Sequence, residues 1–173
     1  MDYVVIREYR KEDIKTMVDL IDKVFIETYT NIFDKEFFQS MDKSYERRLE
    51  LENRDFDKLK DNTFLLEVDG VVEGFVQVGK CKIPSRSTSG EIQMIYLTKK
   101  VQGKGLGKKL FVKGVERLKQ LGYKDFYVGC FNGNESAKFY HHLGGVYKFS
   151  VQTRLVRDYQ ENFFYFEDVD KFL

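Results

Sequence analysis

Three glycines at positions 103, 105 and 107 form the pattern with the clearest chemical use in this sequence. They stand in VQGKGLGKKL, residues 101–110, after a glutamine and before an apolar run. The first amides of a helix have no partner within the helix and carry the positive end of its dipole. Glycines let an anion approach such amides because they have no Cβ. The stretch therefore predicts a loop that binds phosphate or pyrophosphate. Three lysines add positive charge nearby: Lys104, Lys108 and Lys109.

The spacing of these glycines excludes two common phosphate loops. A Walker loop needs GxxxxGK followed by serine or threonine, and Lys109 stands where that hydroxyl would be. A Rossmann fingerprint needs GxGxxG after the first strand of a doubly wound sheet. Here the third glycine comes one residue early, and the loop follows the fourth predicted strand. The glycines alone leave a tight turn without a ligand as an equal alternative.

A second stretch favours a functional role for the loop. Residues 134–140 have the sequence NESAKFY, on a predicted helix after the next strand. The pattern Q-x-x-G-x-G at 102–107, followed by N-x-x-A-x-F-Y, resembles the GNAT superfamily of acyl-CoA-dependent N-acetyltransferases, whose pyrophosphate loop begins with Arg or Gln. The resemblance is specific over residues 91–150 and covers the whole chain as a fold. Gly145 departs from it, since many members have an aromatic residue there.

The resemblance implies how the cosubstrate, acetyl-CoA, binds. In the family, the strand before the glycine loop separates from the next parallel strand, and pantetheine inserts between them; here these strands would be residues 91–97 and 125–131. Backbone groups of Ile95 and Leu97 would pair with the pantetheine amides, and an amide near Ile95 would polarise the thioester carbonyl. The implied cofactor-binding residues are Ile95, Tyr96, Leu97, Gln102, Gly103, Lys104, Gly105, Leu106, Gly107, Lys108, Asn134, Ser136 and Tyr140.

The resemblance also implies a mechanism and two catalytic residues. A primary amine attacks the thioester directly, CoA leaves as a thiolate, and Tyr140 gives that thiolate a proton. Glu91 is the candidate base that takes a proton from the incoming ammonium, directly or through water. A surface position at the end of a strand is an equal alternative for Glu91.

Tyr140 and Asn134 also have structural alternatives. Tyr140 could be a core aromatic residue, but helical spacing places it on one face with the small Ala137. Phe139 and Leu143 are expected to form the opposite, core-facing pair. This arrangement favours a role for Tyr140 at the ligand. Asn134 suits the N-cap of a helix as well as it suits a contact with pantetheine.

Two histidines and two cysteines have no predicted catalytic role. His141 and His142 are adjacent on a helix and so point in different directions, and no set of Cys, Asp or Glu ligands accompanies them. We expect solvated histidines and no metal. Cys81 and Cys130 lack CxxC spacing and are expected to be buried, inert thiols of a reducing compartment.

Composition and charge argue against several other function classes. The net charge is +1, which gives no case for nucleic acid or a membrane surface as partner. No apolar stretch approaches the roughly 18 residues of a transmembrane helix. The N-terminus, MDYVVIREYR, lacks the layout of a signal peptide. We therefore expect a cytoplasmic protein.

The elements that must position these residues follow from the period of the apolar residues. Strands are predicted over 3–7, 63–68, 71–78, 91–97, 125–131, about 146–153 and 162–167. Helices are predicted over 12–29, about 42–60, 106–121 and 134–143, the last stopped by Gly144-Gly145. This order indicates a mixed α+β fold, and the resemblance implies the GNAT fold: a mostly antiparallel twisted sheet of six to seven strands, with one splayed parallel pair and helices on both faces. One proline and the lack of a long polar linker predict a single domain, residues 1–173.

The acceptor is the least determined feature. In the family, the segment between the first two helices walls the substrate site; here residues 27–38 carry Glu27, Asp34 and Glu36 among aromatic residues. Carboxylates with aromatics suit a cationic amine, and they are equally ordinary surface. A small amine such as a polyamine or amino sugar is the main hypothesis. A protein N-terminus or lysine, and a non-catalytic acyl-CoA sensor, are the alternatives. A homodimer is left open.

Overall fold

The computed structural model describes residues 3–153 and 159–173 of the chain. Over this part the strands are β1 (Val4–Glu8), β2 (Thr63–Val68), β3 (Val71–Lys80), β4 (Gly90–Leu97), β5 (Phe126–Phe131), β6 (Val146–Gln152) and β7 (Gln160–Phe166). The helices are α1 (Ile14–Tyr29), α2 (Lys35–Lys43), α3 (Tyr45–Leu59), α4 (Leu106–Gln120) and α5 (Ser136–His142). Within the described residues no helix is both long and apolar enough to cross a membrane.

The strands form a seven-stranded sheet in the order β1-β2-β3-β4-β5-β7-β6. The β1–β2, β2–β3, β5–β7 and β6–β7 pairs are antiparallel, and β4 and β5 are parallel. This confirms the predicted fold class. The chain divides into two compact units, Met1–Gln77 with Met94–Gly114 and Val78–Gln93 with Val115–Leu173. Strands β3 and β4 and helix α4 contribute residues to both units.

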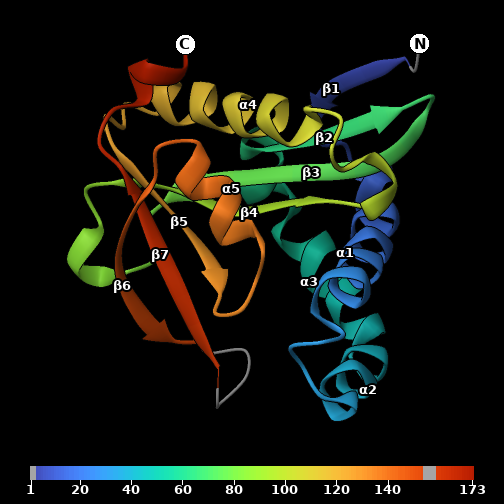
Figure 1. The fold of residues 1–173 in the computed structure, drawn as a ribbon. Helices are drawn as coiled ribbons and strands as arrows, with labels where there is room; N and C mark the ends of the chain where they lie inside the picture. Colours follow the sequence, from blue (N-terminus) through green and yellow to red (C-terminus); the bar gives the residue numbers. More distant parts are fainter. Residues whose placement is uncertain (1–2, 154–158) are drawn as a thin grey trace. The chain divides into compact units, whose positions relative to one another are not determined.

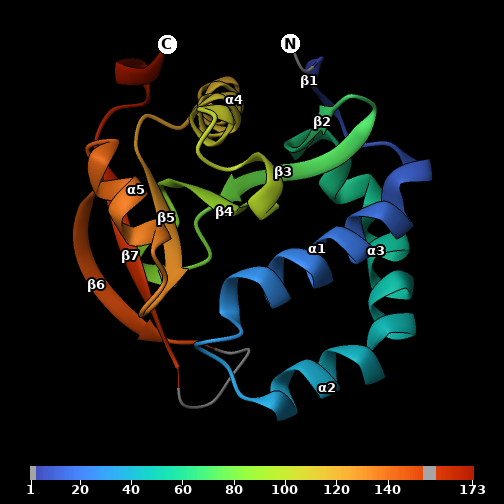
Figure 2. The same ribbon diagram turned by 45° about the vertical axis from the view of Figure 1, so that its right-hand side comes forward.

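The first unit is built on the predicted hairpin of β2 and β3. Its turn is Asp69-Gly70, and both residues have the positive φ that such two-residue turns require, 53° and 80°. Opposite faces of the hairpin are covered by different helices. Phe75 packs against Tyr96, which also contacts Phe25 of α1, whereas the ammonium of Lys113 on α4 lies 5.0 Å from the centre of the Phe64 ring. Figure 1 shows β1, β2 and β3 side by side, and Figure 2 shows α1 and α3 packed together.

The second unit is a sheet of the start of β4 with β5, β7 and β6. β4 pairs with β5 over Gly90–Ile92, opposite Phe126–Val128, and then continues to Leu97. In Figure 1, α5 lies against the β5–β7 part of this sheet. It contacts the face that carries Phe164, because the Tyr140 and Phe164 rings are 5.8 Å apart. The other face carries Tyr127 and Phe163, which cluster with Cys81.

Several element boundaries differ from the sequence-based expectation. Residues 35–43 form helix α2, which was not predicted; Asp34 begins it by accepting a hydrogen bond from the Phe37 amide at 2.8 Å. The charged helix expected at 42–60 is α3, and it begins only after Ser44. α5 is shorter than expected, and β7 begins at Gln160 rather than Asn162. The last of these shifts brings Glu161 into a strand.

Candidate active site

The backbone of the glycine loop takes a conformation that suits glycine. Gly103 and Gly105 have φ of 75° and 76°, in the region that favours glycine. A Cβ built at either position would meet no atom within 4 Å. The loop from Gln102 to Gly105 is exposed, and α4 begins directly after it at Leu106. The backbone is therefore bare and open where the helix presents its first amides. Gly107 lies in the first turn of α4 rather than in the loop.

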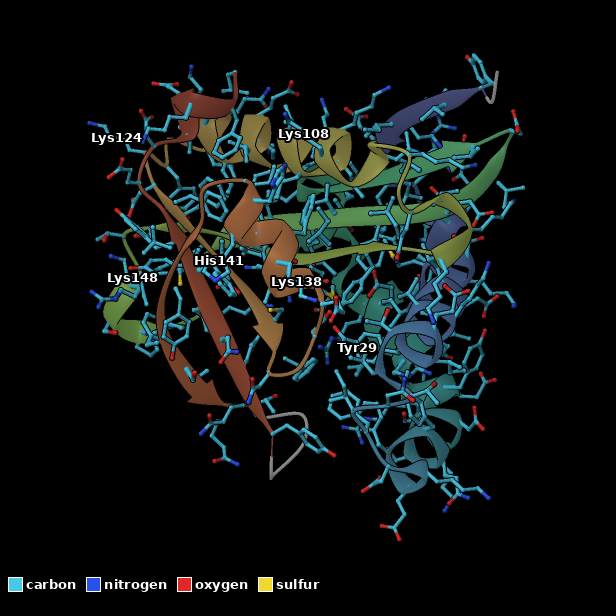
Figure 3. The ribbon with its side chains drawn as sticks, viewed as in Figure 1. Tyr29, Lys108, Lys124, Lys138, His141 and Lys148 are labelled. Atoms are coloured by element: carbon cyan, nitrogen blue, oxygen red, sulfur yellow. The ribbon has the colours of Figure 1, made fainter. Side chains whose placement is uncertain are left out.

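The first turn of α4 has the charge of an anion site. It contains no acidic residue, although acidic residues are the usual occupants of a helix N-terminus. Lys108 and Lys109 are exposed there instead, and Figure 3 shows Lys108 on this helix. Cations at this end of a helix are repelled by its dipole unless an anion lies between them. The arrangement can hold a phosphate or pyrophosphate.

The side chain of Gln102 ties the loop back to β4. Its Nε2 donates a hydrogen bond to the Leu97 carbonyl at 2.9 Å. This hydrogen bond holds the start of the glycine loop close to Leu97, the last residue of β4. Binding of the cofactor by Gln102 stays a prediction.

Glu73 is a buried carboxylate that binds the segment directly before the glycine loop, and sequence reasoning missed it. Its side chain on β3 is 2% exposed. It accepts hydrogen bonds from Thr98 Oγ1 at 2.6 Å and from Lys100 Nζ at 2.7 Å, and its backbone carbonyl accepts from the Thr98 amide at 2.9 Å. Burial opposes the charged form, but the bonds from Lys100 and Thr98 outweigh it and lower the pKa of Glu73. Glu27 of α1 adds a bond from the Lys99 amide at 2.8 Å.

The end of β4 is pressed closely against β3. A Cβ at Gly74 would lie 2.7 Å from the Tyr96 carbonyl oxygen and 3.1 Å from Leu97 Cγ, so only glycine allows this approach. The Tyr96 ring packs among Phe25 and Phe75, and its hydroxyl lies 3.1 Å from that of Tyr29. Side-chain packing therefore fixes the strand whose backbone was predicted to pair with pantetheine; the pairing itself stays a prediction.

In the second unit, Asn134 shapes the start of α5. Its Oδ1 accepts a hydrogen bond from the Ser136 amide at 2.9 Å, and its carbonyl accepts from the Ala137 amide at 3.1 Å. The side chain thus satisfies an amide at the helix start, as the structural alternative proposed. Binding of pantetheine by Asn134 or Ser136 stays a prediction.

Tyr140 is the buried residue of α5, which corrects one expectation. Its side chain is 4% exposed, whereas Phe139 and Leu143 are only half-buried. The expectation that Phe139 and Leu143 form the core-facing pair opposite Tyr140 is therefore wrong. The reason is tertiary: α5 packs on β7 through the contact of Tyr140 with Phe164. The catalytic role of Tyr140 stays a prediction.

Glu91 is not a surface residue. It is 6% exposed, stands opposite Tyr127 in the parallel ladder, and accepts a hydrogen bond from the Lys82 amide at 2.6 Å. Burial raises the pKa of its carboxyl group. A carboxylate whose pKa is raised toward neutrality is a better general base at physiological pH. The surface alternative for Glu91 is excluded, and its role as base stays a prediction.

A second carboxylate, that of Glu161 of β7, lies on the same face, is partly buried and was missed. The sheet registers give this placement, because Glu161 stands opposite Phe131, which shares a strand face with Tyr127. Burial and the charge of Glu91 raise the pKa of Glu161 to about 7. In the sequence, Glu161 directly precedes the strand predicted over 162–167, so it was not placed in that strand.

The histidines and cysteines were predicted to have no catalytic role. His141 and His142 are exposed, as predicted, and Figure 3 shows His141 on α5; its Nδ1 lies 3.2 Å from the Gly145 carbonyl. Cys81 and Cys130 are buried free thiols, and burial raises their pKa values to about 11 and about 12. Such thiols are protonated and unreactive near neutral pH. Among the described residues, no group of three or more His, Cys, Asp or Glu side chains is placed to hold a metal ion.

The exposed glycine loop and the lysines in the first turn of α4 form an arrangement that can hold an anion. The chain belongs to the acetyltransferase (GNAT) family, because the model of this family matches residues 26–144. It is thus an acetyl-CoA-dependent N-acetyltransferase, which confirms the enzyme class expected from the sequence.

Individual relatives agree with this assignment. The chain is 29% identical to the uncharacterized N-acetyltransferase YuaI of Bacillus subtilis over 138 residues, which are 79% of this chain and 77% of that protein. Its fold is similar to the PaiA N-acetyltransferase of Thermoplasma acidophilum, solved with coenzyme A, with a TM-score of 0.69, 18% identity and coverage of 92% and 98% of the two chains. It is also similar to the putative acetyltransferase YncA of Salmonella typhimurium, solved with acetyl-CoA, with a TM-score of 0.67, 20% identity and coverage of 95% and 93%.

Proposed function

We propose that this enzyme transfers the acetyl group of acetyl-CoA to a small primary amine by direct attack on the thioester, and that residues 1–173 act as one catalytic domain. The observation that carries the proposal is the glycine loop. Its glycines, which have positive φ, leave the first amides of α4 open. The exposed lysines beside them supply positive charge for the phosphates. These groups bind the pyrophosphate through amides from Gly103 to Lys108.

The acyl arm of the donor binds along the end of β4. The parallel ladder with β5 covers Gly90–Ile92, and β4 then continues to Leu97, so backbone groups of Ile95 and Leu97 pair with the pantetheine amides. An amide near Ile95 donates to the thioester oxygen and stabilises the negative charge that develops there. Asn134 and Ser136 bind the arm from the start of α5.

The chemistry uses an acid and a base from opposite faces of the second unit's sheet. The amine loses a proton to Glu91, its nitrogen forms a bond to the acetyl carbon, and the carbon–sulfur bond breaks. Tyr140 protonates the departing thiolate and then recovers its proton from solvent. Tyr140 lies on the Phe164 face, and Glu91 shares the opposite face with Tyr127. This separation supports attack from one side and departure on the other.

The test is release of free CoA thiol from acetyl-CoA across a panel of acceptors. The panel contains alkyl monoamines, polyamines, amino sugars and peptides with free N-termini or lysines. We expect turnover with one or more of the small amines and none with peptides. Turnover confined to peptides would replace the small-amine hypothesis with protein acetylation. Acetyl-CoA binding without turnover on any acceptor would favour a sensor.

A further inference from the structure

We infer that Glu27 of α1 is a positioning residue for the glycine loop, and that it links the binding of CoA at this loop to the order of the turn after α1. The inference rests on the proposed function, since it takes the glycine loop as the site of the CoA phosphates. By sequence, Glu27 was one of the carboxylates that could attract a cationic acceptor. The role inferred here lies on the side of the donor.

The first support is the way the chain begins the short 3-10 helix Lys99–Val101, which leads from β4 to the glycine loop. Thr98 is its N-cap residue, but the Thr98 hydroxyl makes no cap bond because it donates to Glu73 Oε2 at 2.6 Å. The first amides of a helix have no partner within it. The Lys99 amide donates instead to Glu27 Oε2 at 2.8 Å. Glu27 therefore supplies a cap that the short helix lacks.

The second support is the position of Glu27 in its own helix. It lies in the last turn of α1, which contains no basic residue. The C-terminus of a helix carries the negative end of the dipole, so a carboxylate is unfavourable there. The bond from the Lys99 amide offsets this cost, because charge-assisted hydrogen bonds are about twice as strong as neutral ones. A residue that breaks a local rule and is compensated by a distant contact is the pattern expected of a functional position.

The third support is that Lys99 connects this bond to the glycine loop. The Lys99 carbonyl accepts a hydrogen bond from the Gln102 amide at 3.3 Å, and Gly103 follows directly. The amide of Lys99 is thus bound to α1, and its carbonyl is bound to the start of the loop. The side chain of Lys99 is exposed and takes part in neither bond.

On the side of α1, the bond lies next to the turn that follows the helix. Tyr29 is the last residue of α1, and its carbonyl accepts hydrogen bonds from the Ile32 and Phe33 amides, both at 2.8 Å. The Tyr29 hydroxyl lies 3.1 Å from that of Tyr96, near the end of β4. The helix end and the strand end therefore pack together. An anion that orders the glycine loop should also order this turn.

The experiment removes the hydrogen bond from either side. Glu27→Ala deletes the acceptor, and Lys99→Pro deletes the donor at the first position of the short helix, where proline is tolerated. Thr98 has extended backbone, with ψ of 150°, which suits a following proline. Lys99→Gln keeps the amide and Glu50→Ala changes an exposed glutamate of α3, so both serve as controls. Glu27→Gln keeps an acceptor oxygen and should restore most of the wild-type behaviour.

Calorimetry with CoA measures the positioning role. Glu27→Ala and Lys99→Pro should each weaken CoA binding about 10-fold, the low end for a charge-assisted bond, because this bond acts on the ligand through the loop. The double variant should bind CoA no more weakly than either single variant, since both remove the same bond. The two controls should bind as wild type. Losses of CoA affinity that add in the double variant would overturn the inference.

Hydrogen exchange measures the link to α1, which a merely structural role would not produce. Saturating CoA should slow exchange of the Ile32 and Phe33 amides in the wild type and in both controls. Glu27→Ala and Lys99→Pro, also saturated with CoA, should lose this effect. An equal effect of CoA in the wild type and in these two variants, or no effect in the wild type, would overturn the inference. Failure of CoA to bind the wild type would instead contradict the proposed function, so the two failures are distinguishable.

Discussion

At the scale of single residues, the proposed acid can be tested by removing one hydroxyl group. Tyr140 is buried on α5, and its phenol is proposed to act only while the thiolate departs. Tyr140→Phe keeps the ring and its contact with Phe164, and a group used only in the transition state lowers kcat without weakening ground-state binding. We expect kcat to fall about 10- to 100-fold, near the low end for general acids because thiolate is already a fair leaving group.

The measurement pairs steady-state rates with calorimetry for acetyl-CoA, which should bind Tyr140→Phe with nearly wild-type affinity. The matched control is Tyr147→Phe, which removes the hydroxyl of a half-exposed tyrosine of β6. If Tyr140→Phe turned over at the wild-type rate while chemistry limits the reaction, Tyr140 would be only a packing residue.

The raised pKa of Glu161 also predicts how the stability of the fold depends on pH. Its pKa is raised from 4.5 to about 7 in the folded protein, so the folded state holds a proton that the unfolded state releases between these values. Stability therefore falls as pH rises from 4.5 through 7. Glu161→Gln removes this loss and should gain up to about 2 kcal/mol over wild type at pH 8, but little at pH 4.5. Denaturant unfolding at both pH values checks this; equal differences at the two pH values would contradict it.

At the scale of elements, the glycine loop is tested by adding a side chain. Gly105→Val places a branched group where pyrophosphate is proposed to lie, and it should weaken acetyl-CoA binding about 100-fold or more, because several charge-assisted amide contacts are lost. Gly122→Val is the control, since Gly122 follows α4 with a similar φ of 88° and equally open space. Both variants place valine at a similar positive φ, so only a loss of acetyl-CoA affinity specific to Gly105→Val supports the loop. Equal acetyl-CoA affinity in the two would reduce the loop to a turn.

The segment Thr98–Lys100 gives a second prediction at this scale. Glu73 holds it through Thr98 and Lys100, directly before the glycine loop. Glu73→Gln replaces the charged acceptor and loosens the segment, so we expect the KM for acetyl-CoA to rise about 10-fold, the value of one charge-assisted bond, with kcat at saturation nearly unchanged. Lys15→Gln, which removes an exposed ion pair with Asp19 far from this segment in the sequence, should change neither constant. A fall in kcat with unchanged KM would refute this positioning role.

At the scale of the whole molecule, ligand binding should stabilise the fold. A ligand that binds only the folded protein adds about 2.7 kcal/mol at 100 times its dissociation constant. Acetyl-CoA and CoA should therefore raise the melting temperature, while NAD and ATP raise it far less. Thermal unfolding with each ligand at matched concentration checks the expectation. Stabilisation by NAD or ATP without stabilisation by CoA would overturn the proposed coenzyme.

The sequence by itself determined the features that depend on local backbone chemistry. Glycine at positions 103 and 105 permits the positive φ found there, and Asp69-Gly70 is a dipeptide typical of the hairpin turn that it forms. The alternation of apolar residues located the strands, and the combination of both motifs indicated the enzyme family. Such features depend on neighbours in the chain, so a single sequence is enough to predict them.

Only the tertiary structure decided which side chains meet across the sheet. The packing of β7 against α5 buried Tyr140, and the register of β5 against β7 laid Glu161 over Gly129. Glu73 accepts hydrogen bonds from Thr98 and Lys100 because β3 and the end of β4 lie close together. These contacts join residues that are distant in the chain, and their burial and charge coupling depend on that proximity. The burial of Tyr140, the placement of Glu161 and the bonds that hold the segment before the glycine loop therefore come from the tertiary structure.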